Sequence, residues 1–236
     1  MKKKILVIGS GEAEPVDASG FDIVYAANSA FTRVNRARCI HLVLSDAMLF
    51  TSDMLEGRSP IAGMDEAAST SFRLKKYSTI DNKFFEHVTV VDNKSVAIES
   101  AIARKNVSCN ALAELTYLEL WRVFFKCFGI RDLILIFINL IGLKNKLRFL
   151  AQMTMKKRMN VSFRPSTGII ALMLAYFNYP EAEIYISGMN VYDDTGGRPG
   201  VYSIGRMISD NKIHLMDSVY GALFHKKGVR ALTADA

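Results

Sequence analysis

The sequence KILVIGSGE (Lys4–Glu12) places a short, unalternating apolar run directly before a glycine-containing turn. An apolar run without alternation is typical of a parallel strand that is buried on both faces. Glycines that follow a first strand let the backbone turn sharply and approach a ligand closely. The stretch therefore predicts the first strand of an α/β nucleotide-binding fold.

Two further apolar runs follow at the spacing of successive strands. FDIVYA (Phe21–Ala26) leads to Asn28, and CIHLVL (Cys39–Leu44) leads to Asp46. In open α/β sheets, ligands bind at the carboxyl ends of the strands, so we expect Ser10, Asn28 and Asp46 to converge there. Each of the three is also a common turn former, which is the simpler interpretation of any one of them.

The first glycine turn departs from the dinucleotide fingerprint G-x-G-x-x-G. Gly9 and Gly11 fit the pattern, but position 14 is Glu. Glu12 and Glu14 would also repel a pyrophosphate lying over this turn. The turn therefore argues against a standard NAD site.

A second ligand-binding pattern precedes the apolar run Ile169–Phe177. Arg164, Ser166, Thr167 and Gly168 stand directly before that run. Ser or Thr before an apolar run is a helix N-cap signal, and a helix start attracts anions. Arginine adds a forked donor for phosphate. The pattern predicts a phosphate-binding loop, and an ordinary capped core helix is the alternative.

The next strand ends in polar residues as well. Glu183–Ser187 reads as a strand, and Gly188, Asn190 and Tyr192 follow it. We expect this strand end to point at the same ligand as the loop before the helix. The pair Asp193-Asp194 precedes a Gly- and Pro-rich stretch, which favours a loop over a metal site.

Composition limits the class of protein. The chain has 236 residues, half of them apolar, and a formal net charge of +7, which suit one α/β domain with an acidic partner. Cys39, Cys109 and Cys127 follow no metal or redox spacing, so we expect reduced thiols. Only four apolar residues separate MKKK from Gly9, so we expect no signal peptide and a cytoplasmic location.

The middle of the chain, residues 51–160, reads as a variable, partly helical insertion within a single domain. Glu86–Val91 predicts a strand, and Ala97–Phe128 carries apolar residues at helical spacing. Leu133–Leu143 is almost wholly apolar but shorter than the ~20 residues of a membrane span. Lys144–Arg158 holds six basic residues and no acid.

This apolar and basic stretch has two interpretations. It lies on an anionic bilayer surface, at the inner face of the membrane, or it is a buried helix followed by a solvated basic helix. Nucleic acid is a weaker candidate, because too few aromatic residues are interleaved with the basic ones.

Of the four histidines, one is placed to act as a base. His41 falls within a core strand, His87 in a strand, and His225 on a late helix. His214 alone sits in a polar loop, before the helical stretch Met216–Lys226, where a site at the sheet edge can reach it. Residues 228–233 predict a last strand.

Together these residues resemble the bacterial sialyltransferases that use CMP-sialic acid, a family with one Rossmann-like domain and a small lid. Residues 9–13 are similar to the family's glycine loop, Asn28 to its asparagine after the second strand, and residues 45–46 to its turn after the third strand. Residues 164–168 are similar to its Arg-x-Thr-Ser-Gly loop, and residues 187–192 to its Ser-Gly-Ile-Asp-Phe-Tyr strand end. His214 is similar to the family's late histidine. Ser10, Glu12 and Asn190 depart from the family's Asn, Pro and Asp, and residues 51–160 do not align.

The resemblance implies a metal-independent, inverting transfer of sialic acid from a CMP-sugar donor to a glycan or glycolipid acceptor, in lipopolysaccharide or capsule biosynthesis, with no cofactor. It implies His214 as the base, Tyr192 as a donor to the departing phosphate, and Arg164 as an orienting group. The nucleotide would lie on the residues Gly9, Ser10, Gly11, Asn28, Asp46, Ser166, Thr167, Gly168, Gly188 and Asn190.

Three alternatives stay open. A related CMP-Kdo transferase with a retaining mechanism would need a carboxylate nucleophile, and Asp46 or Asp210 is the first candidate. A non-catalytic protein that binds a nucleotide sugar or assembles others is the second. A different Rossmann-type enzyme is the third. The oligomeric state is also open, a homo-oligomer included.

Overall fold

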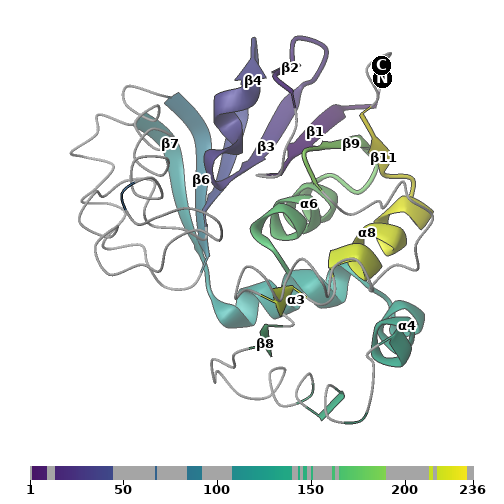
Figure 1. Cartoon of the computed structure of the whole chain (residues 1–236). Helices are drawn as coiled ribbons and strands as arrows, with labels where there is room; N and C mark the ends of the chain where they lie inside the picture. Colours follow the sequence, from purple (N-terminus) through teal and green to yellow (C-terminus); the bar gives the residue numbers. More distant parts are fainter. Residues whose placement is uncertain are drawn as a thin grey trace.

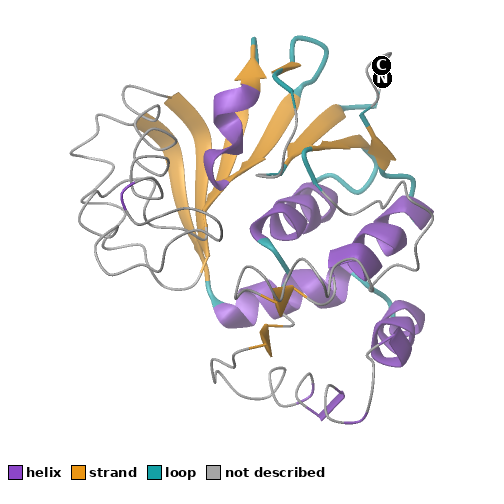
Figure 2. Ribbon diagram, in the orientation of Figure 1, coloured by secondary structure: helices purple, strands orange, loops and turns teal. Residues whose placement is uncertain are grey.

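The computed structural model describes residues 2–9, 14–44, 67, 84–91, 108–139, 143, 146–147, 150, 161–162, 165–189, 213–214 and 217–232. It has an α/β architecture around a seven-stranded sheet (Figures 1 and 2). The strands of this sheet are β1 (Lys4–Ile8), β3 (Ile23–Ala27), β5 (Ile40–Leu44), β6 (Phe84–Val91), β7 (Ser108–Leu115), β9 (Glu183–Ser187) and β11 (Arg230–Ala231). Their order is β11-β9-β1-β3-β5-β6-β7, and every neighbouring pair is parallel. The predicted α/β fold with a mostly parallel sheet is therefore confirmed.

Four short strands form two small parallel sheets beside the main one. β2 (Val16–Asp17) pairs with β4 (Val34–Asn35), and β8 (Val161–Ser162) pairs with β10 (Ile213–His214). The β8–β10 pair joins two segments that are about fifty residues apart in the chain and lie on either side of α6 and β9 in the sequence.

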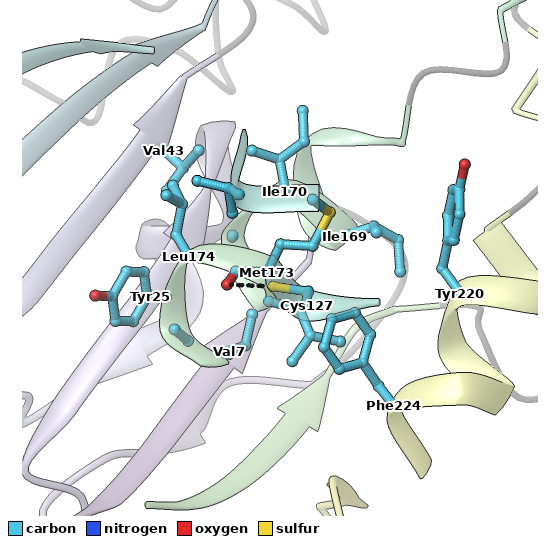
Figure 3. Close-up of a cluster of buried hydrophobic side chains, with 14 of the residues drawn as sticks. Val7, Tyr25, Val43, Cys127, Ile169, Ile170, Met173, Leu174, Tyr220 and Phe224 are labelled. Atoms are coloured by element: carbon cyan, nitrogen blue, oxygen red, sulfur yellow. Dashed lines mark hydrogen bonds between the residues drawn. The ribbon is translucent and has the colours of Figure 1, made fainter. Parts of the chain in front are cut away.

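Helices cover one face of the main sheet. They are α3 (Tyr117–Cys127), α4 (Ile130–Asn139), α6 (Thr167–Asn178) and α8 (Asp217–Lys226). Ile169 to Ala175 of α6 are all buried, because this helix has the sheet on one side and α3 and α8 on the other. A helix that is apolar all round is typical of such a central position. Figure 3 shows α6 side chains meeting Val7, Tyr25 and Val43 of the sheet and Phe224 of α8.

The opposite face of the sheet has its own core. Leu6 and Ile8 of β1 point to this side, and the 3-10 helix η1 (Asn28–Arg33) packs there. The rings of Phe31 in η1 and Phe85 in β6 meet edge to face, with centroids 5.3 Å apart. Because both faces are covered, the central strands β1, β3 and β5 are almost wholly buried without alternation, as expected for a parallel sheet.

The predicted helix over Ala97–Phe128 is wrong for the residues that form β7. Ser108–Leu115 is rich in Ala, Leu and Glu, which favour helices, but it pairs with β6 along its length. Main-chain bonding to the sheet outweighs this weak local preference. The helix begins only after Thr116, which forms a capping box with Glu119. The segment expected to be an insertion thus contributes two strands, β6 and β7, to the main sheet.

The described part of the apolar run Leu133–Leu143 belongs to a helix that is buried on one side only. Within α4, Ile136 is fully buried, but Ile134 and Ile138 are 53% and 63% exposed. Among the residues that the structure describes, no helix combines the length and the apolar composition that crossing a membrane requires.

Candidate functional site

The candidate site lies where the sheet grows in two directions from its first strand. From β1, the order runs through β3, β5, β6 and β7 on one side and through β9 and β11 on the other. At such a switch point the connections leave in opposite directions, and a crevice opens beyond the carboxyl ends of the strands. Gly9 follows β1 and Gly188 follows β9, in matching register, because Ile8 is the partner of Ser187.

The turn after β1 is tightly packed against the turn after β9. The Gly9 amide donates to the carbonyl of Ser187 at 2.9 Å. A Cβ atom on Gly9 would lie 2.5 Å from both the carbonyl oxygen of Gly188 and Cγ of Met189. Only glycine fits this contact. Gly188 has a φ of +61°, in the left-handed region that glycine adopts without strain.

The start of α6 packs directly on the same turn. Ser166 caps the helix, and its hydroxyl accepts from the Ile169 amide at 3.4 Å. A Cβ on Gly168 would lie 3.7 Å from Cα of Gly9 and 3.3 Å from Cε of Met189. The start of α6 therefore lies directly beside the end of β1. The predicted N-cap is confirmed, and Gly168 is brought beside Gly9 and Met189.

The electrostatics of this helix start favour an anion. The first turn of α6 holds no acidic residue. The amides of a first helical turn and the positive end of the helix dipole attract phosphate groups. The α6 start therefore has the charge distribution that suits a bound anion.

Asn28 occupies the neighbouring position along the same edge. It is the first residue of η1 and follows β3, whose Ala26 is the register partner of Ile8. Its φ of +50° is in the left-handed region, which asparagine tolerates better than most residues. The structure therefore brings Gly9, Asn28 and Gly188 to one edge of the sheet, as the strand pattern predicts.

Two further side chains lie at this edge that the sequence does not predict there. The Arg33 guanidinium, from the last turn of η1, donates to the carbonyl oxygen of Gly9. Burial lowers the pKa of Arg33 from its usual value, although an arginine remains charged at neutral pH. Met189 lies across both Gly9 and Gly168. Neither carries a signal in the sequence, because both contacts join residues that are far apart along the chain.

Several predicted site residues lie outside the described residues: Ser10, Gly11, Asp46, Arg164, Asn190 and Tyr192.

His214 lies in a strand rather than in the polar loop that the sequence predicts. It pairs with Ser162 in the parallel β8–β10 ladder, which orders its backbone. Parallel neighbours lie about 4.8 Å apart. Ser162 precedes the cap residue Ser166 by four positions, a span of at most about 14 Å. The backbone of His214 is therefore held beside the segment that leads into the α6 start.

The other histidines have positions that fit their predicted places. His41 is buried in β5 between the rings of Tyr25 and His87, at centroid distances of 4.7 and 4.4 Å. Burial, and secondarily the nearby His87, lower the pKa of His41 to about 4. His225 lies at the end of α8. His41 is thus a neutral core residue at physiological pH.

Within the described ranges, no three His, Cys, Asp or Glu side chains are grouped as a metal ion requires.

Comparison with models of known protein families, with curated proteins and with solved structures gave no match to this chain.

Proposed function

We propose that the protein is a glycosyltransferase that transfers sialic acid or a related ulosonic acid from a CMP-sugar donor to a glycan acceptor. The observation that carries this proposal is the packing of the capped α6 start against Gly9 and Met189 at the switch point of the sheet. Such an edge suits a nucleotide whose phosphate faces the helix start. The incomplete dinucleotide fingerprint favours a mononucleotide such as CMP over NAD.

The chemistry follows from the charge that develops on the departing CMP. Breaking the bond between the sugar and the phosphate adds negative charge to the phosphate oxygens. Preorganised donors stabilise that charge, and the α6 amides and Arg33 are the cationic and dipolar groups at this edge. Tyr192 and Arg164 would add a hydroxyl donor and a forked cation, so the mechanism does not require a divalent cation.

The acceptor must lose a proton as its hydroxyl attacks the anomeric carbon. We assign this role to His214, whose backbone is paired with the segment leading into α6. His214→Ala should then abolish transfer and leave CMP binding within about twofold. Transfer that persists in this variant would remove His214 as the base.

A negative charge introduced at the helix start tests the nucleotide site itself. Thr167→Glu adds an acid to the first turn of α6, which is favourable for the helix but unfavourable for a bound phosphate. Two unit charges about 8 Å apart at an effective dielectric constant of about 20 repel by about 2 kcal/mol. CMP affinity should therefore fall roughly thirtyfold.

The control is Leu118→Glu, which makes the same change at the start of α3. Leu118 is 74% exposed, and α3 follows β7, four strands away from β1. Because Leu118 is exposed, the added carboxylate lies in solvent, where salt screens its charge. Leu118→Glu should leave CMP affinity unchanged, and equal losses in the two variants would argue against the site.

Thermal-shift measurements identify the ligand class, since a ligand that binds the native state raises the Tm. We expect stabilisation by CMP and little by UDP, NAD or S-adenosylmethionine. CMP binding without turnover of any CMP-sugar would instead indicate a non-catalytic binding protein. A retained anomeric configuration in the product would indicate the Kdo-type mechanism.

A further inference from the structure

Among the described residues, exposed apolar side chains are concentrated in one short part of the sequence. Eleven large apolar residues are exposed among those that the structure describes, and seven lie within 130–150. These seven are Ile130, Ile134, Leu135, Ile138, Leu143, Leu147 and Leu150. Isolated exposed apolar residues are common on protein surfaces, but a concentration of this kind marks an interaction surface.

Helix α4 is docked through one side and exposes the other. Ile136 is fully buried, and the Asp132 carboxylate pairs with the ammonium of Lys227, just after α8, at 3.1 Å. Ile130, Ile134 and Ile138 repeat every four residues and therefore form one stripe. Their exposed fractions are 78%, 53% and 63%. The stripe is a stable surface feature, because the buried side fixes the helix.

A second stripe follows along the chain. Leu143, Leu147 and Leu150 are helical and exposed, at a spacing that places them on one side of a helix. The Lys146 ammonium lies over the Phe137 ring, 5.4 Å from its centroid, which places this turn against α4. We call the exposed residues of the two stripes the apolar ridge: Ile130, Ile134, Ile138, Leu143, Leu147 and Leu150.

Charge distinguishes the possible occupants of the ridge. From Leu133 to Pro180 the sequence holds seven Lys or Arg and no Asp or Glu. In a symmetric dimer the same patch meets itself, so a second copy would bring this basic stretch against its own charge. An anionic lipid surface complements it, because lysines beside an apolar helix face are attracted to acidic headgroups.

We propose that the apolar ridge inserts into the headgroup region of an anionic bilayer and holds the protein on the membrane surface. The aliphatic side chains enter the boundary between headgroups and acyl chains, and the ammonium of Lys146, beside the ridge, is attracted to the acidic lipids. This attachment is independent of the proposed nucleotide chemistry, which lies at the sheet edge.

The test is co-sedimentation of the full chain with vesicles. We expect binding to phosphatidylcholine vesicles that contain phosphatidylglycerol, and at least tenfold weaker binding to pure phosphatidylcholine. Binding should also weaken as salt is raised, because screening shortens the reach of the lipid charge. Equal binding to both vesicle types, or no binding to either, would overturn the proposal.

The ridge is tested by Ile134→Ser with Ile138→Ser, two exposed positions of α4. Their matched control is Leu118→Ser with Phe125→Ser, which are 74% and 50% exposed on α3 and lie outside the ridge. We expect the partition coefficient onto vesicles that contain phosphatidylglycerol to fall at least tenfold in the ridge variant and to change less than twofold in the control. Both should keep the wild-type circular-dichroism spectrum and a cooperative thermal transition, which shows that they are folded.

The rival occupants give different results. If the ridge joined two copies, sedimentation equilibrium would show a wild-type dimer that the ridge variant dissociates, without any vesicle binding. If it bound an acidic protein, wild type and ridge variant would partition equally onto the anionic vesicles. Either result would contradict a lipid-binding ridge.

Discussion

Replacing Gly9 by alanine adds a methyl group where the turns after β1 and β9 leave no room. The new Cβ would lie 2.5 Å from the carbonyl oxygen of Gly188 and from Cγ of Met189, whereas ordinary contacts begin near 3.4 Å. Both overlaps are therefore about 0.9 Å. The methionine can move, but the carbonyl belongs to a backbone that is hydrogen-bonded across the two strands.

The magnitude follows from two opposing effects. Overpacking of this kind costs about 1–3 kcal/mol. Gly→Ala also restricts the unfolded chain, which returns about 0.4–1 kcal/mol. We expect a net loss of about 1–2 kcal/mol in the free energy of unfolding, or a drop of roughly 2–8 °C in Tm for a chain of this size.

Urea denaturation of matched variants is the assay. Gly20→Ala is the control, because a Cβ at Gly20 meets nothing within 4 Å, and this variant should be as stable as the wild type or slightly more so. Met189→Ala removes one of the two overlaps, so Gly9→Ala should cost less in that background. The packing described for this turn would be refuted if Gly9→Ala were as stable as Gly20→Ala.

Two further predictions concern buried titratable groups. Because the pKa of His41 is about 4 in the folded chain and 6.5 in its ordinary state, the folded form binds fewer protons between these values. The free energy of unfolding should fall by up to about 3 kcal/mol as pH falls from 6.5 to 4. In urea titrations, His41→Phe should remove this decrease, and the control His225→Gln should keep it. Burial raises the pKa of Cys127 to about 12, and its thiol donates to a carbonyl, so a disulfide reagent should modify the partly exposed Cys39 and Cys109 but reach Cys127 only after unfolding. Loss of all three native thiols at one rate would contradict the second prediction.

The parts of the fold that were predictable are those in which local pattern and burial agree. β1, β3 and β5 are continuous apolar runs, and each lies inside the sheet with both faces covered. The start of α6 was predictable because Ser166 caps the helix through its own local bond. Asn28 and Gly9 could be placed on one edge because successive parallel strands end together.

The remaining features depend on contacts that no local pattern carries. β7 is built from helix-forming residues and is a strand only because β6 offers an edge to pair with. The bond from Arg33 to Gly9 joins residues 24 positions apart. The exposure of α4 was also not predictable, because an apolar run looks the same whether its second face is covered or bare.

The central claim is that a nucleotide phosphate binds at the start of α6, beside the turns after β1 and β9. The most direct measurement is a CMP titration of ¹⁵N-labelled protein followed by the backbone amide resonances. We predict that the amides of Gly9, Thr167, Gly168 and Gly188 shift together, with one common saturation curve, and that those of the α3 start do not move. Saturable CMP binding that leaves these four resonances unchanged would contradict the claim.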